Sequence, residues 1–542
     1  MPARAKIIYI YVHVRREANI DSDHYLTRIK IKFTPKTKFT KKTPAIPKFD
    51  LLKIKDTNII EEWEQQPAED WENFQTKIIK TAKNLIPLRK KPKHPWWNQE
   101  CENALEERIK AFRNYNCNKS EATQKTFFEV RKQVSKILRQ NKRKYVNDQL
   151  KSIEDNFKNY NTRDFYKTFA NQIKGYSPQN LCFRKQDGKL ALTNKENCQE
   201  LATYFSQLLN CPEPKQRFPI VQSEIAQEKS SPPTQEEIHS HIKKLKNNKT
   251  SGEDGIVAEL LKSLGPNSLK EITQIIQSIW QTGKLPDDWK VALIHPLHKK
   301  GNKSDVNNYR GISLLSVTYK ILSACLLDRT QKQLEPELSE YQAGLRPSRS
   351  CPEQIFNLKT ILKIRALRQK PIVCTFVDFK KAYDSIDRPS LFQILEDRGL
   401  DPKTRELIKQ TLTDTKSKVK FMGEISEAFE IRTGVRQGDG LSPILFNVVL
   451  DKVMEEWKEE LKKCESWKPI RLGFPKNNLY IPYLAFADDL EILSEDEDTA
   501  VKQLEALKEC AEKVGLQISF EKTKLICSKT EITSLRTKYG KI

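Results

Sequence analysis

The run YLAFADDLEIL, residues 483–493, places two adjacent carboxylates, Asp488 and Asp489, inside an otherwise apolar stretch. A stretch that is apolar on both sides of an acidic pair predicts a buried β-hairpin with the carboxylates at its tip. Two such charges repel each other and resist desolvation, so the expected partner is a divalent cation that prefers oxygen ligands, such as Mg²⁺. Taken alone, such a run is more often a turn that carries two solvated acids.

A further carboxylate ends a strand upstream of this pair. IVCTFVDFKKAYD, residues 372–384, begins as a β-branched and aromatic run that reaches Asp378. Ligands commonly bind beside the C-terminal ends of such strands. Next to the Asp488 hairpin, Asp378 would help to hold two Mg²⁺ ions about 3.5 to 4 Å apart, the arrangement used for in-line phosphoryl transfer. We predict that Asp384 and Asp387 are local cap or surface acids.

Between these two runs lies GVRQGDGLSPILFNVVLD, residues 434–451. Its glycines let the backbone approach a planar partner closely. Ser442-Pro443 predicts a helix start with Ser at the N-cap and Pro at N1, and the apolar residues that follow have helical spacing. By itself, a glycine-rich loop before a helix is more often a tight turn than a ligand site.

Together these segments resemble reverse transcriptases, specifically those of non-LTR retrotransposons of the LINE type, such as jockey-like elements. FVDFKKAYD is similar to that family's motif A, GVRQGDGLSPILFN to motif B, AFADD to motif C, and GLQISFEKTK (515–524) to motif D. Upstream, LIHPLHKKGNKSDVNNYRGISLL (293–315) resembles the basic fingers motif and EYQAGLRPSRSCPEQIF (340–356) the template-side motif. KNNKTSGEDGIVAELLK (246–262) resembles the segment that opens the domain.

The resemblance implies an α+β fold, with the fingers and palm of a right-hand polymerase and a mostly helical N-terminal region. The palm should be a split βαβ unit. In it we expect the Asp378 strand, a hairpin around Gly423, a helix over 443–463, the Asp488 hairpin, a helix near 498–513 and a returning strand at KTKLICS.

The resemblance also implies a role for each matched residue. Asp378 and Asp488 match the metal-binding aspartates, and Asp489, the second carboxylate of the hairpin, completes the catalytic set. The expected nucleotide-binding residues are the ring that excludes a ribose 2′-hydroxyl, the loop that touches the nascent base pair, the fingers cations on the triphosphate and a proton donor to pyrophosphate. Tyr383 is the ring, and Gln437 and Gly438 form the loop. Lys299 and Arg310 are the fingers cations, and Lys522 is the proton donor. Motif D usually carries Asn where this chain has Ser519.

The implied activity is that of an RNA-directed DNA polymerase, which extends a primer 3′-hydroxyl on an RNA template by two-metal nucleotidyl transfer. The expected cofactor is Mg²⁺, with Mn²⁺ as the alternative ion. The expected partners are an RNA template, a DNA primer or target and deoxynucleoside triphosphates, without a membrane; protein partners are unknown. The rival hypotheses are a reverse transcriptase of the group II intron type and an inactive or domesticated RNA-binding remnant.

Composition agrees with a nucleic-acid enzyme, because the 542-residue chain has a formal net charge of +24. Basic runs without acids recur at 28–42, 77–93 and 131–144. Taken singly, such runs are usually solvated faces, but several of them ahead of a polymerase-like core favour contacts with RNA template or target DNA.

The eleven cysteines form no CxxC pair. Scattered cysteines of this kind are typical of reduced thiols in an intracellular protein, and we expect a location in the nucleus, the cytoplasm or both. IIYIYVHV, residues 7–14, is too short to span a membrane and is predicted to be a strand.

The N-terminus carries a second resemblance. VRREANIDSDHYLTRIKIKF, residues 14–33, resembles the last strand of the apurinic-type endonuclease domain that precedes the polymerase in this family, with Asp23 and His24 at its catalytic pair. We therefore predict that residues 1–33 are an inactive remnant of an endonuclease/exonuclease/phosphatase-type domain.

The rest of the chain divides into two predicted regions. Residues 34–234 are expected to be a helical, basic linker. Residues 235–542 are expected to be the reverse transcriptase domain, with its core over about 278–542 and without a thumb. The chain would then correspond to a family protein truncated at both ends.

Overall fold

The computed structural model describes residues 7–15, 26–33, 49, 54, 58–87, 95–173, 182–185, 187–219, 230–463, 470–472, 480–528 and 536–541. The chain divides into two compact units, of which unit 1 comprises residues 1–41 and 89–180 and unit 2 comprises residues 42–88 and 181–542. Asp23 and His24 lie outside the described residues. Within the described ranges, no helix is both long and apolar enough to cross a membrane.

The described residues of unit 1 form an antiparallel β-hairpin and three helices. These are β1 (Ile7–Arg15), β2 (Leu26–Phe33), α3 (Gln99–Cys117), α4 (Glu121–Lys158) and α5 (Thr162–Ile173). Helix α4 begins with a capping box, in which Ser120 and Thr123 satisfy each other's backbone N–H groups. Phe127 of α4 packs on Phe112 and Tyr115 of α3. The predicted strand near the N-terminus and the predicted helices in this region are thus present.

Unit 2 is built around two sheets. The first is a four-stranded antiparallel sheet, here called the palm sheet, with spatial order β11 (Tyr483–Phe486), β12 (Asp489–Ser494), β5 (Val373–Val377), β13 (Lys524–Cys527). The second is a five-stranded sheet of β4 (Tyr309–Leu314), β3 (Val291–His298), β6 (Thr415–Phe421) and β7 (Glu424–Ile425), with β8 (Phe429–Ile431) also paired to β6.

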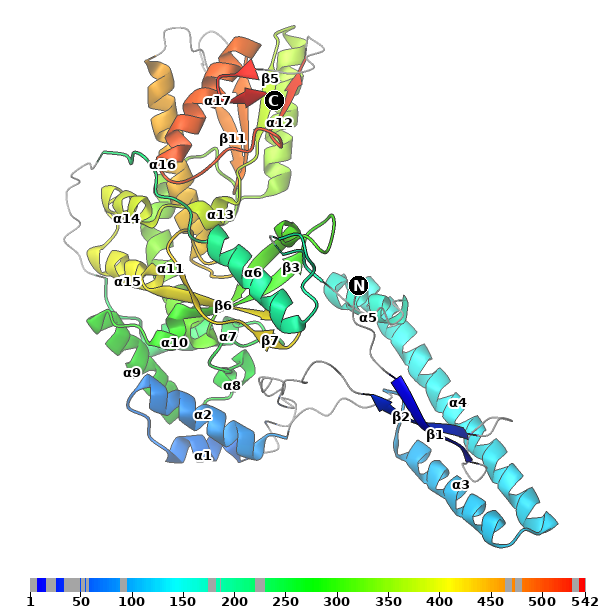
Figure 1. Cartoon of the computed structure of the whole chain (residues 1–542). Helices are drawn as coiled ribbons and strands as arrows, with labels where there is room; N and C mark the ends of the chain where they lie inside the picture. The colour runs from blue at the N-terminus through cyan, green and yellow to red at the C-terminus, as the bar shows by residue number, and fades with distance from the viewer. Residues whose placement is uncertain are drawn as a thin grey trace. The chain divides into compact units, whose positions relative to one another are not determined.

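Helices cover both faces of the palm sheet (Figure 1). Leu490 and Ile492 of β12 point into the main core, which they share with α16 (Ser442–Lys462) and α17 (Glu497–Glu512). The alternate residue Leu493 joins a second cluster with Ile361 of α12 (Cys351–Leu367). Since side chains alternate across a strand, the apolar run around the acidic pair serves both faces, as expected for a buried hairpin.

The remaining elements that the structure describes in unit 2 are mostly helices. They are α1 (Ile59–Gln65), α2 (Trp71–Leu85), α6 (Asn194–Leu208), α7 (Gln235–Lys244), α8 (Ala258–Lys262), α9 (Pro266–Thr282), α10 (Asp287–Lys290), η2 (Val306–Asn308), α11 (Val317–Leu334), η3 (Glu335–Glu337), α13 (Ala382–Ser385), α14 (Arg388–Asp397), α15 (Pro402–Leu412), β9 (Ile470–Arg471), β10 (Tyr480–Ile481), β14 (Arg536–Thr537) and β15 (Gly540–Lys541).

Two details of the predicted palm are wrong. The hairpin around Gly423, β6 and β7, belongs to the second sheet, because β6 pairs in parallel with β3 and its Val419 packs in a separate core with Phe205. Helix α16 has Leu441 rather than Ser442 at its N-cap. The Ser442 hydroxyl instead donates to the carbonyl of Arg436, 2.8 Å away, and so secures the preceding loop.

The segment predicted as a linker is divided between the two units. Trp63 of α1 and Phe74 of α2 are fully buried in the main core of unit 2. Helix α6 packs on β6, with Phe205 in the core of the second sheet. These parts of 34–234 therefore help to build the core of unit 2.

Asp254 is expected to make the stability of unit 2 depend on pH. Its carboxyl is buried and accepts a hydrogen bond from the Ser316 hydroxyl at 2.7 Å, and burial raises the pKa of Asp254 to about 7. The pKa of Asp254 in the folded state lies above its value in the unfolded state. The contribution of Asp254 to the stability of the fold is therefore complete below about pH 4 and is lost as pH rises through about 7.

We expect Asp254→Asn to remove this loss of stability at rising pH. The loss amounts to at most about 1.4 kcal/mol per pH unit between the unfolded-state and the folded-state pKa of Asp254. Urea denaturation at about pH 5 and about pH 8 should show a smaller pH dependence than in the parent. Asp401 is the matched control, because hydrogen bonds from Thr404 and Ser230 outweigh burial and lower its pKa. The ionised Asp401 carboxylate stabilises the fold at pH values above its unfolded-state pKa, so the Asp401→Asn variant should be less stable than the parent near neutral pH. Identical pH profiles for Asp254→Asn and the parent would contradict the assignment.

Candidate active site

Strand pairing brings the three predicted catalytic aspartates together. Asp378 directly follows β5, which pairs with β12, and β12 begins at Asp489. Asp488 lies in the turn that joins β11 to β12. Burial, followed by the charges of Asp488 and Asp378, raises the pKa of Asp489. Carboxylates from segments about a hundred residues apart therefore lie within electrostatic reach of one another at one edge of the palm sheet.

The ligand set at this edge is incomplete. In the described part of the chain, no group of three or more His, Cys, Asp or Glu residues is close enough to hold a metal ion. The carboxylates offer only oxygen atoms, which suit a hard divalent cation. Mg²⁺ in polymerase sites usually takes one or two carboxylates and completes its shell with water and substrate phosphates. The residues present fit such an ion.

Lys522 approaches the aspartates from the motif D segment. Its Nζ lies 3.8 Å from Oδ1 of Asp378, and the two side chains are 67% and 44% exposed, so the ion pair is open to solvent. Both residues and Asp489 line a cavity of about 380 Å³ between the palm sheet and α12. The backbone N–H of Ser519 donates to the Asp378 carbonyl at 2.8 Å. The attachment of this segment therefore uses the backbone of residue 519 rather than its side chain.

Tyr383 lies within electrostatic reach of Asp488. Its ring stacks on Phe446 of α16, with centroids 4.4 Å apart and planes inclined by 18°. Burial, followed by the charge of Asp488, raises the pKa of Tyr383, and the charge of Arg310 opposes that shift. Tyr383 thus holds a stacked ring within electrostatic reach of both Asp488 and Arg310, the predicted metal ligand and the predicted triphosphate cation.

Gln437 joins three of the predicted motifs. Its Oε1 accepts from Nε of Arg310 at 2.8 Å, and its Nε2 donates to Oδ1 of Asp384 at 2.6 Å. Its carbonyl accepts from the Ser313 N–H at 3.0 Å, which ties the loop to β4. Gly438 follows with φ of +111°. The amide of Gln437 therefore has a fixed orientation that aligns the Arg310 guanidinium.

Asp384 is a site residue that the sequence did not reveal. The prediction of a cap or surface acid is wrong for Asp384, whose side chain is buried beneath Gln437, but right for Asp387, which caps α14 by accepting from the Ser390 N–H. Burial raises the pKa of Asp384 to about 6, while its hydrogen bond with Gln437 and the nearby cations Arg310, Lys381 and Lys299 lower it. No local pattern in AYDSI distinguishes such an acid from a solvated one.

A palm sheet with acids at adjacent strand ends, a second sheet that supplies basic residues and a glycine loop between them form the arrangement expected of a right-hand polymerase. Residues 297–538 match the family model "Reverse transcriptase (RNA-dependent DNA polymerase)". This part of the chain is therefore a reverse transcriptase domain.

Curated relatives agree with the non-LTR resemblance. The chain is 24% identical over 352 residues to "Transposon TX1 uncharacterized 149 kDa protein" of Xenopus laevis, covering 62% of this chain and 26% of that protein. It is 30% identical over 218 residues to "RNA-directed DNA polymerase from mobile element jockey" of Drosophila melanogaster, covering 40% and 24%. The chain thus spans about a quarter of the length of these relatives. Among solved structures, apo telomerase of Candida tropicalis matches with a TM-score of 0.35 and 15% identity, over 48% of this chain and 54% of that one.

Proposed function

We propose that this chain is an RNA-directed DNA polymerase of a non-LTR retrotransposon, which extends a primer 3′-hydroxyl with deoxynucleotides on an RNA template. The observation that carries the proposal is the meeting of Asp378, Asp488 and Asp489 at one edge of the palm sheet. Paired carboxylates at that position, beside fixed cations, suit transfer of a nucleotidyl group better than they suit RNA binding alone.

The proposed cofactor is Mg²⁺, with Asp378 and Asp488 as its protein ligands and Mn²⁺ as the alternative ion. When bound, two such ions would activate the primer 3′-hydroxyl and stabilise the charge on the triphosphate and its leaving pyrophosphate. The mutually repelling carboxylates at the edge of the sheet are the chain's own contribution to this site.

Around this centre, the chain's residues bind and orient the substrate. Arg310, aligned by Gln437, would pair with triphosphate oxygens, and Lys299 would add a second positive charge. Lys522, beside Asp378, would give a proton to the departing pyrophosphate. Of these groups, Arg310 is already oriented without substrate by its hydrogen bond to Gln437.

Primer extension tests the proposed function. The purified chain should extend a DNA primer annealed to an RNA template when Mg²⁺ is supplied, and chelation of the ion should stop it. The alternative is a non-enzymatic RNA-binding remnant, which the basic run 131–144 on α4 would also allow. That protein would bind RNA with an affinity that falls steeply with salt, yet extend no primer under any metal condition.

Sugar selection provides a second test of the site. We expect Tyr383→Val to raise incorporation of ribonucleotides relative to deoxynucleotides by about tenfold or more, because the ring beside Asp488 would no longer occupy the space of a 2′-hydroxyl. Single-nucleotide extension with matched rNTP and dNTP measures the ratio. Tyr383→Phe is the control, since it keeps the ring and should keep the discrimination. Unchanged selectivity in the Val variant would remove Tyr383 from the site.

A further inference from the structure

The tip of the catalytic hairpin has an unfavourable backbone. Phe486 and Asp489 face each other across the hairpin, and only Ala487 and Asp488 lie between them. Ala487 has φ of +55°, in the left-handed region. Turns of this kind favour Gly, Asn or Asp at such positions, because a Cβ crowds the backbone there. Something other than local preference must therefore hold Ala487 in place.

The side chain of Gln342 makes the missing contacts. Its Oε1 accepts from the Ala487 N–H at 2.9 Å, and its Nε2 donates to the Ala487 carbonyl at 3.2 Å. One amide side chain thus satisfies both backbone groups of the strained residue, as a neighbouring strand would. Gln342 is 3% exposed, so these bonds form away from competing water.

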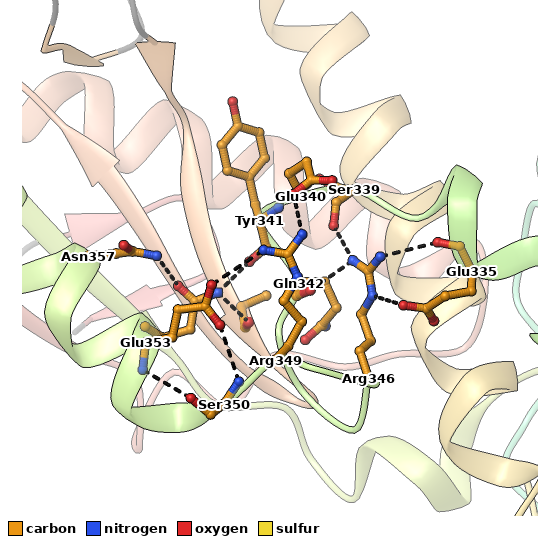
Figure 2. Close-up of polar contacts among 12 residues, drawn as sticks. Glu335, Ser339, Glu340, Tyr341, Gln342, Arg346, Arg349, Ser350, Glu353 and Asn357 are labelled. Atoms are coloured by element: carbon orange, nitrogen blue, oxygen red, sulfur yellow. Dashed lines mark hydrogen bonds and ion pairs between the residues drawn. The ribbon is translucent and has the colours of Figure 1, made fainter.

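The segment that carries Gln342 is itself fixed. Figure 2 shows Arg346 inside the loop, where its guanidinium donates to the carbonyls of Ser339 and Gln342 and pairs with Glu335. The Gly344 N–H adds a bond to Oε1 of Gln342 at 2.7 Å.

The same segment also lies directly against the hairpin. The Ala343 N–H donates to the Ala485 carbonyl, and the Ala485 N–H donates to the Tyr341 carbonyl, both at 2.9 Å. A Cβ on Gly344 would lie 1.8 Å from the Ala487 nitrogen, so the backbones touch where only glycine fits.

We propose that Gln342 is a positioning residue for the polymerase reaction: it locks Ala487 in the left-handed conformation and thereby holds the Asp488 carboxylate opposite Asp378. This inference rests on the proposed function, since it concerns the geometry of the same carboxylates. Gln342 acts through the hairpin backbone and touches neither substrate nor metal.

The test compares Gln342→Met with Gln503→Met. Met has nearly the shape of Gln but cannot make the three amide bonds. Gln503 is an equally buried amide, which accepts from the Ser494 hydroxyl and donates to the Leu493 carbonyl, remote from the hairpin tip along β12. Each variant is measured for hydrogen exchange of the Ala487 amide, for Mn²⁺ affinity by electron paramagnetic resonance, and for primer extension.

Gln342→Met should expose the Ala487 amide to exchange and weaken Mn²⁺ binding. Its kcat should fall about tenfold to a hundredfold with little change in the KM for primer-template, because small displacements of reacting groups have effects of this size. Gln503→Met should lose thermal stability without these changes. If Gln342→Met does not fold, Gln342→Glu replaces it, since Glu keeps the shape but places an acceptor against the Ala487 carbonyl.

Unchanged protection of the Ala487 amide, or lost protection with normal Mn²⁺ affinity, would overturn the proposal. A kcat effect equal to that of Gln503→Met would overturn it as well. If the parent chain extends no primer, the proposed function fails separately, and the exchange and Mn²⁺ measurements still decide whether Gln342 positions Asp488.

Discussion

Asp488→Asn is expected to lower the rate of primer extension by about a thousandfold or more, with RNA affinity within about twofold of the parent. The substitution replaces a charged metal ligand with a neutral amide of the same size, so the hairpin and its contacts with Gln342 should persist. Loss of several kcal/mol of transition-state stabilisation corresponds to this factor, because about 1.36 kcal/mol is tenfold in rate. Single-turnover extension and filter binding of the template measure the two quantities.

Asp498→Asn is the matched control. Asp498 is an exposed acid in the first turn of α17, and its substitution makes the same change in charge and size without touching the palm edge. Its extension rate should equal that of the parent. An Asp488→Asn variant that extends primers as well as the control does would mean that Asp488 binds no metal ion.

Local sequence patterns correctly predicted the elements in which the spacing of apolar residues marks the buried face. The hairpin at 483–494, the strand before Asp378 and helices α16 and α17 all have a periodicity that matches one environment along their length. Local patterns did not predict the sheet to which a strand belongs. The Gly423 hairpin was placed in the wrong sheet because β6 pairs with β3, more than a hundred residues earlier in the chain, and nothing within β6 encodes that partner.

Charge patterns were less informative, because the partner of a charge is set by tertiary contacts. Lys77 begins one of the basic runs predicted to bind nucleic acid, yet its side chain is buried and pairs with Glu271 at 2.5 Å. It also donates to the Gln66 carbonyl at 2.8 Å. A cation with these partners is not available to a phosphate. The opposite error concerns Asp384, a buried acid that was taken for a surface residue.

Contacts between a side chain and a distant backbone are harder still to predict. Gln342 lies in a segment whose resemblance indicated a template-side role, and its bonds to Ala487 span 145 residues of sequence. Only the positive φ at Ala487 shows that an outside support is needed. An alanine between a phenylalanine and two aspartates gives no sign of that conformation in the sequence.

Gly438→Ala is expected to lower kcat/KM for the incoming nucleotide by about a hundredfold, chiefly by raising KM. The residue has φ of +111°, which a residue with a Cβ rarely adopts, and the added Cβ would lie 2.8 Å from the carbonyl oxygen of Ser313. The loop must then move away from β4, and Gln437 loses its bonds with Arg310 and Asp384. A hundredfold change corresponds to about 2.7 kcal/mol, the size expected for backbone strain plus a lost charge-assisted hydrogen bond.

The control for this prediction is Gly423→Ala. Gly423 also has a positive φ, +89°, but a Cβ added there meets no atom within 4 Å. It lies at the turn between β6 and β7, so the substitution adds conformational strain without moving the Gln437 loop. We expect a lower thermal midpoint for both variants and a raised nucleotide KM for Gly438→Ala alone. Equal KM values in the two variants would show that strain, rather than the close approach of the loop to β4, accounts for the effect, and that Gln437 does not align Arg310 for the triphosphate.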